Sequence, residues 1–304
     1  MIRYPAASSF YLHLSFLIGL TVIIATTFAD RAWAGAWTEA KGASYNKFAF
    51  NYYYSDQSFD SSGNLQRYTN NGTSPISSFY DRDLAYYGEY GLRDDLTVFA
   101  DTMYKSLSSE QATGTLTNSG ISDIDLGLRY NFYNGPKGVF SAQGLFKYPG
   151  AYNKNDPVPL GNGQNDYELR MLYGNGSLYP FYYGVELGYR WRAGDPSDEW
   201  KYLFEAGYTF SPKFYARTKL DGTYSAKNGA TGVDITGNPT LTNNYDIGKL
   251  ELTAGYVLTK SMNLEGTWTA NPYGKNTAYG NTFQIAIIYM TRPSSSEVSE
   301  GGVR

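Results

Sequence analysis

The chain has 304 residues, with 25 Lys and Arg against 28 Asp and Glu, a formal net charge of −3 and a mean hydropathy of −0.43. It holds 31 Tyr, 16 Phe, 5 Trp and 33 Gly, but no Cys. This composition excludes disulfides, thiolate metal sites, a bundle of transmembrane helices and a strongly basic nucleic-acid surface, and it favours β structure.

The first segment, residues 1–34, has the pattern of a secretory signal peptide. Arg3 precedes an uncharged, largely apolar run at 10–28, and Ala32-Trp33-Ala34 follows. Small residues at positions −3 and −1 predict cleavage before Gly35. The alternative is an uncleaved anchor, because the run is close to the ~20 residues that span a bilayer.

Beyond Gly35, apolar residues recur at every second position, which is the period of a β-strand. In 179–192 the odd positions are Tyr, Phe, Val, Leu or Trp, and most even positions are Gly, Glu or Arg. Segments 123–132 and 201–210 repeat the pattern. About twelve such strands of roughly ten residues are expected, a length that suits tilted membrane-spanning strands.

The connections between these strands alternate between short and long. Short connections rich in Gly, Pro, Asn and Asp are expected at 93–95, 134–137, 174–176, 211–213 and 259–261. Long polar connections are expected near 55–78, 108–120, 149–163, 193–200, 225–244 and 271–279. We therefore predict an all-β, antiparallel, up-and-down transmembrane β-barrel of about twelve strands over 35–290, with both termini periplasmic. Residues 291–304 would form a polar C-terminal tail.

A soluble β-sandwich would also alternate, with its apolar face buried. Aromatic residues instead crowd the strand ends, for example at 52–54, 86–87 and 181–183, as in the interfacial girdles of membrane barrels. The last predicted strand, 283–289, resembles the signal that barrel-assembly machinery reads. These features favour the outer membrane of a Gram-negative cell, with membrane lipid and that machinery as partners.

The polar face of the strands gives the candidate lumen-lining residues. The basic candidates are Lys47, Lys105, Arg129, Lys147, Arg170, Arg190, Arg192, Lys201, Arg217, Lys219 and Lys249. The acidic candidates are Asp83, Glu89, Asp101, Asp123, Asp125, Glu168, Glu186, Glu205, Glu251 and Glu265. Two roles are open: pairing across strands that holds the barrel together, and charge rings that filter solutes in a narrow pore.

Catalysis is not expected. The single histidine, His13, lies in the predicted signal peptide, so the mature protein would have neither His nor Cys, and Ser–His–acid chemistry is excluded. A carboxylate pair could serve glycoside hydrolysis, but strand alternation already accounts for the carboxylates. The pattern at 123–127 partly matches a calcium loop but has apolar intervening residues. We predict no enzyme activity, no metal and no cofactor.

The stretch 120–130, G-I-S-D-I-D-L-G-L-R-Y, resembles the strand motif G-x-x-D-x-x-L-G-x-(K/R)-Y of an outer-membrane transporter family named for the meta-pathway of phenol degradation. Further similarities lie at 161–168, 187–190 and 193–200, so the resemblance covers most of 36–290. It implies a channel that admits small aromatic or other hydrophobic compounds. The tail beyond Tyr289 departs from the usual barrel ending.

We therefore predict a barrel that gives passive passage to small solutes and has no nucleic-acid partner. The alternative is a non-conducting surface barrel whose long extracellular loops bind a ligand or an envelope partner.

Overall fold

The computed structural model describes residues 35–70, 76–230 and 237–292. The predicted signal peptide and almost all of the predicted tail lie outside these ranges. Twelve long strands run through the described residues, and each pairs antiparallel with the next. They are β1 (Ser44–Phe59), β3 (Ile76–Arg93), β4 (Leu96–Gln111), β5 (Gly114–Gly135), β6 (Gly138–Tyr148), β7 (Asp166–Asn175), β8 (Phe181–Arg192), β9 (Glu199–Ser211), β10 (Phe214–Ser225), β11 (Asp246–Thr259), β12 (Met262–Lys275) and β13 (Thr277–Thr291).

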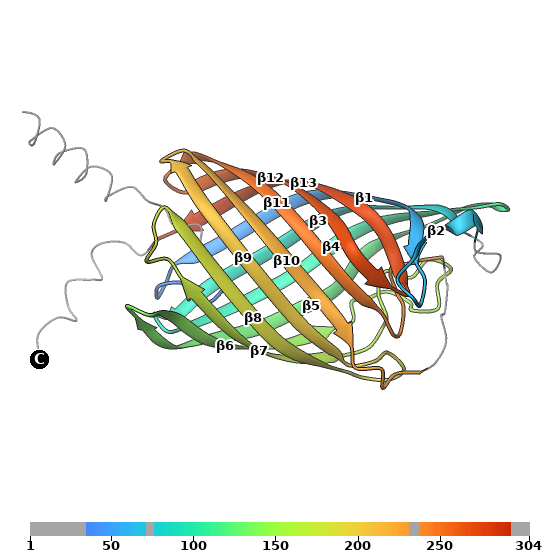
Figure 1. Ribbon diagram of the computed structural model, residues 1–304, viewed down its shortest axis with the longest axis horizontal. Helices are drawn as coiled ribbons and strands as arrows, with labels where there is room; N and C mark the ends of the chain where they lie inside the picture. Colours follow the sequence, from blue (N-terminus) through green and yellow to red (C-terminus); the bar gives the residue numbers. More distant parts are fainter. Residues whose placement is uncertain (1–34, 71–75, 231–236, 293–304) are drawn as a thin grey trace, which may run out of the picture. The chain divides into compact units, whose positions relative to one another are not determined.

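The sheet closes on itself, because β13 also pairs with β1 and Ser44 is the register partner of Thr291 (Figure 1). The barrel therefore starts and ends at the same, periplasmic, end. A short strand β2 (Leu65–Arg67) pairs with the far end of β1 and leads into a 3₁₀ turn, η1 (Tyr68–Asn70). This confirms the predicted up-and-down barrel. No helix of the described ranges is long and apolar enough to cross a membrane.

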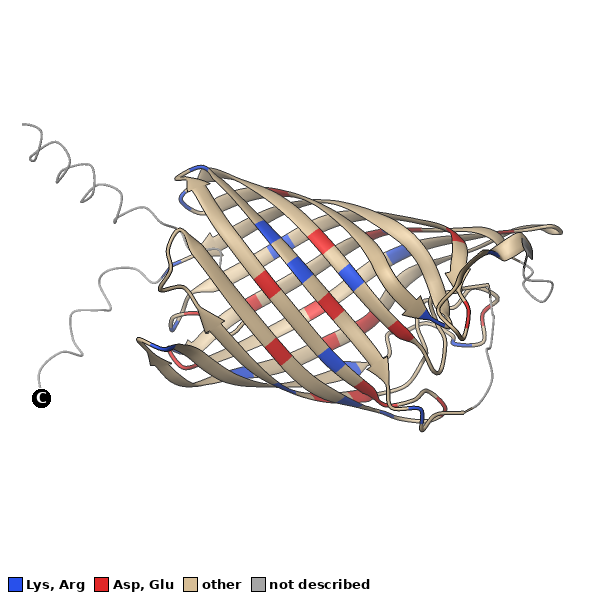
Figure 2. Ribbon diagram, in the orientation of Figure 1, with Lys and Arg blue, Asp and Glu red and all other residues tan. Residues whose placement is uncertain are grey.

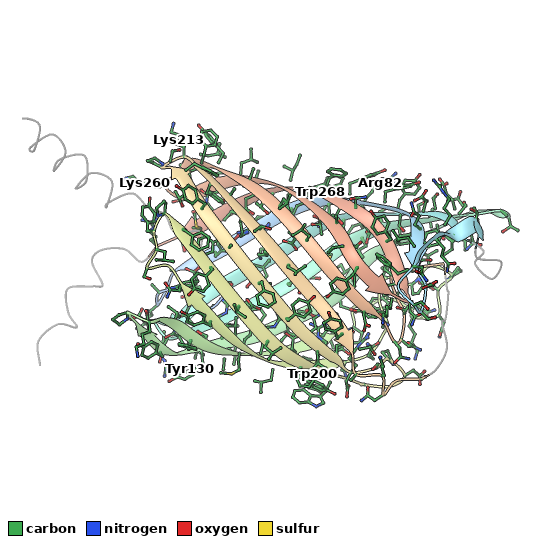
Figure 3. All side chains as sticks on the ribbon, viewed as in Figure 1. Arg82, Tyr130, Trp200, Lys213, Lys260 and Trp268 are labelled. Atoms are coloured by element: carbon green, nitrogen blue, oxygen red, sulfur yellow. The ribbon has the colours of Figure 1, made fainter. Side chains whose placement is uncertain are left out.

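The two faces of the wall are the reverse of those of a soluble protein. Outward-facing Phe283 and Ile285 are 58% and 64% exposed, whereas inward-facing Glu168 and Glu265 are 4% and 1% exposed. Lipid accounts for this inversion, because hydrocarbon accepts apolar side chains on the outer face. It also accounts for the closure of the sheet, because hydrocarbon offers no hydrogen-bond partner to an open edge. Exposed aromatics lie toward both ends of the wall, such as Tyr130 toward the periplasmic turns and Trp200 toward the opposite end (Figure 3).

The five short connections lie where they were predicted, but two predicted long loops are wrong. Only residues 112 and 113 separate β4 from β5, and only Asn276, with φ 50°, separates β12 from β13. The strands continue through 108–120 and 271–279. The β4–β5 hairpin projects beyond the neighbouring strands (Figure 1). Where a strand extends beyond the membrane, both of its faces meet water and both carry polar residues. The sequence of such a strand therefore resembles that of a loop.

Candidate functional site

The candidate site is the interior of the barrel. Its wall carries ladders of buried ion pairs, seen as alternating basic and acidic positions on the strands in Figure 2. Glu168 on β7 accepts from Arg170 at 2.7 Å and from Arg190 on β8 at 2.8 Å. Arg170 also reaches Glu186 at 2.6 Å. Such pairs need several partners to offset the cost of removing charges from water.

A second ladder crosses the opposite part of the wall. Glu265 on β12 is paired with Lys47 on β1 and with Arg217 on β10, both at 3.1 Å. The hydroxyl of Tyr215 donates to the other Glu265 oxygen at 2.9 Å. Lys219 pairs with Glu205 at 3.3 Å. Glu265 is therefore fully partnered although only 1% of it is exposed.

All predicted candidates occupy the same strand face as these ladders, by register and by their ion pairs. Sixteen of them form ion pairs: Lys47, Lys105, Arg129, Lys147, Arg170, Arg190, Arg192, Lys201, Arg217, Lys219, Glu89, Asp123, Glu168, Glu186, Glu205 and Glu265. The remaining five, Asp83, Asp101, Asp125, Lys249 and Glu251, have no ion-pair partner within the described residues. Whether any of the set contacts a solute stays a prediction.

The sequence prediction missed three acidic partners. Asp81 pairs with Lys105, Asp166 with Lys147, and Glu199 with Arg192. Each of the three lies two residues before a candidate on the same strand. Continuing the alternation one step toward the strand end would have found them.

The ion pairs follow the wall and do not bridge the lumen. Every lumen ion pair among the described residues joins strands that are at most two positions apart in the barrel, as Arg217 on β10 and Glu265 on β12 are. Most of the wall charges are thus paired with charges on their own strand or on strands close by. This arrangement leaves the middle of the lumen without a cross-linking salt bridge.

Three carboxylates make one part of the wall acidic. Asp101 on β4 is the register partner of Asp125 on β5, and Asp83 on β3 lies nearby. Asp83 accepts from the Asn51 amide at 2.6 Å. Lys249 on β11 is the register partner of Asp221 and is the single candidate of the set that is exposed. The lumen surface is therefore unevenly charged.

The segment before β1, residues 35–43, lies against the inner wall at the periplasmic mouth. Its backbone oxygens accept from Ser141 on β6, at Ala36 (2.5 Å), and from Arg129 on β5, at Trp37 (3.0 Å). The Glu39 amide donates to Thr97 on β4 at 2.8 Å. We call residues 35–43 the inner strap.

Trp37 is the anchor of the inner strap. Its ring packs on the buried cluster of Ala36, Val139 and Leu172. A Cβ on Gly174 would overlap this ring, so the missing side chain on β7 makes room for it. The strap thus extends from β7 to β3 and narrows the periplasmic mouth along five neighbouring strands.

Glu39 of the inner strap is an unusual carboxyl. Burial, together with the nearby Glu89, raises its pKa to about 7, and Arg129 opposes the shift. Arg129 is already engaged by both oxygens of Glu89 at 3.1 Å. The Glu39 carboxyl therefore favours its neutral form in the docked strap.

The loop between β6 and β7, residues 149–165, folds against the inner wall at the other mouth. Val158 and Leu160 are 0% and 3% exposed and pack on Phe79 of β3 and Leu107 of β4. The Asn118 amide donates to the Val158 oxygen at 2.9 Å. We call residues 149–165 the outer plug.

The outer plug is tied down by further hydrogen bonds. The Ser122 hydroxyl donates to the Leu160 oxygen at 3.0 Å, and the Tyr152 hydroxyl donates to Asp123 at 2.5 Å. The Asn238 amide, from the loop after β10, donates to the Pro159 oxygen at 2.8 Å. The outer plug therefore reaches from β3–β5 to the loop between β10 and β11.

No family model matches the chain, and no curated protein matches it either. Among solved structures, the chain is similar to the COG4313 outer membrane channel from Pseudomonas putida F1, with a TM-score of 0.66 and 14% identity over 86% of this chain and 100% of that one. It is also similar to the NanC porin, with a TM-score of 0.50 and 9% identity over 80% and 98% of the two chains. At these identities the likeness shows the fold, that of outer-membrane β-barrels.

Proposed function

We propose that the barrel gives small solutes passive passage across the outer membrane. The observation that carries the proposal is the arrangement of the ion pairs, which join neighbouring strands along the wall and, among the described residues, place no salt bridge across the lumen. Two solved barrels of the same fold are an outer membrane channel and a porin. In this account the protein is not an enzyme.

At the periplasmic mouth the passage runs along the β9–β13 part of the wall. The inner strap lies against β3–β8 and leaves β9–β13 uncovered there, whereas the outer plug reaches the loop between β10 and β11 at the other mouth. Lys249, the exposed lumen candidate, lies on β11 in this accessible part. In a narrow pore such a charge acts on permeating ions.

The solutes are small aromatic or other hydrophobic compounds. Support comes from the resemblance of 120–130 to the family named for the meta-pathway of phenol degradation, to which we assign the chain in this proposal. The inner wall also holds aromatic rings beside its charges, for example the buried Phe99, over which Arg129 lies at 5.7 Å. Barrel-assembly machinery would insert the protein by reading β13, whose residues 283, 285, 287 and 289 face lipid.

Liposomes that contain the purified barrel test the proposal. Swelling in a series of solutes should show faster entry of small aromatic solutes than of sugars, and protein-free liposomes give the baseline. Lys249→Glu should shift the ion selectivity toward cations by several-fold, because it reverses an exposed lumen charge. Arg67→Glu, on the exposed strand β2, is the matched control and should leave the selectivity unchanged.

Two outcomes would contradict the proposal. A folded barrel whose liposomes swell no faster than the baseline would exclude passive passage. Deletion of residues 57–74 distinguishes passive passage from the alternative of a surface-binding barrel. In that alternative, the deletion abolishes ligand binding and leaves the permeability unchanged.

A further inference from the structure

A groove on the lipid-facing side of the barrel is not explained by solute passage. It has a volume of about 770 Å³ and lies over strands β8–β13. Its floor is a row of register partners, Ala216, Ala254 and Gly266. Trp268 and Phe283, which are 37% and 58% exposed, stand beside this row. We call this feature the outer groove.

The outer groove is apolar and open at its floor. A Cβ added to Gly266 would meet no atom within 4 Å. Apart from Thr218, the lipid-facing side chains around it are aliphatic or aromatic, and the wall behind it is closed by strand pairing. An acyl chain that lies in such a groove makes van der Waals contacts with the protein on several sides. An acyl chain that lies against a convex part of the wall makes fewer of these contacts.

The position of the outer groove puts it in the periplasmic leaflet. Ala216 lies three residues from Lys213 in one periplasmic turn, and Gly266 lies six residues from Lys260 in another. With a rise of about 3.4 Å per residue and a tilt of about 40°, the floor is roughly 8–16 Å above those turns. This depth is within one half of a hydrocarbon core of about 30 Å.

The turns below the outer groove are basic. Lys213 and Lys260 are exposed, and no acidic residue occurs in 211–213 or 259–261. Figure 3 shows both lysines at the same end of the barrel, with Trp268 further along the wall. A lipid with a negative headgroup complements both the apolar groove and the two lysines.

We propose that the outer groove binds one anionic glycerophospholipid of the periplasmic leaflet, with an acyl chain over Gly266 and the phosphate at Lys213 and Lys260. The site requires that the barrel lies in the membrane but does not depend on solute passage. The bound lipid would act as a fixed part of the lipid-facing wall over β9–β13.

Native mass spectrometry of the delipidated barrel, titrated with phosphatidylglycerol or with phosphatidylcholine of the same acyl chains, tests the proposal. One phosphatidylglycerol per barrel should be retained in preference to phosphatidylcholine. Lys213→Gln and Lys260→Gln should each weaken phosphatidylglycerol binding by about fivefold at low salt. Gly266→Trp should abolish the retained lipid, because the new ring fills the groove.

Matched controls exist for both changes. Lys137→Gln removes a lysine from another periplasmic turn, and Gly144→Trp adds a ring at a lipid-facing glycine that also has no atom within 4 Å of an added Cβ. Both should bind phosphatidylglycerol as the wild type does. Heat-modifiable migration in SDS gels shows that each variant is folded, independently of conductance. Loss of conductance with lipid binding intact would count against passive passage alone.

Three results would overturn the lipid site. The first is equal retention of the two lipids by the wild type. The second is unchanged binding by Gly266→Trp. The third is a barrel dimer that Gly266→Trp disrupts, because the groove would then be a contact between two copies of the chain.

Discussion

The two mouths of the barrel are narrowed by different interactions. The inner strap is held mostly by hydrogen bonds from the wall to its backbone, with Trp37 as its main apolar anchor. The outer plug buries two aliphatic side chains, Val158 and Leu160, completely or nearly so. Burial of an aliphatic side chain contributes about 1.5–3 kcal/mol, whereas an ordinary hydrogen bond contributes about 1 kcal/mol. The periplasmic mouth is therefore expected to open more readily than the outer one.

Removal of the inner strap should have the largest effect. Deletion of 36–42 takes away the segment that lies across five strands, so single-channel conductance should rise several-fold. The outer plug does not contact the strap and should stay docked. Unchanged conductance in a folded deletion variant would mean that the strap does not narrow the passage.

Disruption of the outer plug comes next. Val158→Asp places a charge in the buried cluster with Phe79 and should cost about 2 kcal/mol or more of docking free energy. The loop should then be cleaved by added protease on the order of thirtyfold faster. Lys154→Asp, at an exposed position of the same loop, is the control and should be cleaved at the wild-type rate.

The smallest effect concerns pH at the inner strap. The pKa of Glu39 is raised to about 7 in the docked state, above its ordinary value of 4.5. A carboxyl with a raised pKa favours docking below pH 4.5 and loses that contribution as the pH rises through about 7. Conductance should therefore increase by a few-fold between pH 4.5 and pH 8, and Glu39→Gln should remove this part of the response. If the conductance of Glu39→Gln changed with pH as much as that of the wild type, other titratable groups would be responsible for the pH response.

The barrel could be predicted from sequence because one period governs most of it. Alternation in 179–192 or 283–289 reports directly which face meets lipid, and turn residues mark the periplasmic ends. Alternation did not predict strands at 108–120, because polar residues occupy both faces of β4 and β5 there. Asp81, Asp166 and Glu199 were missed for a related reason, since they stand at the ends of recognisable alternation.

The two constrictions could not be predicted. Residues 35–43 and 149–165 have no periodicity, and their places depend on contacts with strands distant in the chain, such as Trp37 at Gly174 and Val158 at Phe79. Pairing of the lumen charges was weighed as one alternative, but its path along the wall depends on which strands are neighbours. Sequence alternation shows on which face of the sheet a residue lies, but it does not show which residue forms an ion pair with it.

Single-channel recording of the wild-type barrel in planar bilayers is the direct test of passive passage through the lumen. We expect discrete conductance steps, because no ion pair of the described residues crosses the lumen and the inner strap leaves β9–β13 uncovered at the periplasmic mouth. A correctly folded barrel that inserts into the bilayer and shows no conductance, either in the wild type or after deletion of 36–42, would contradict it.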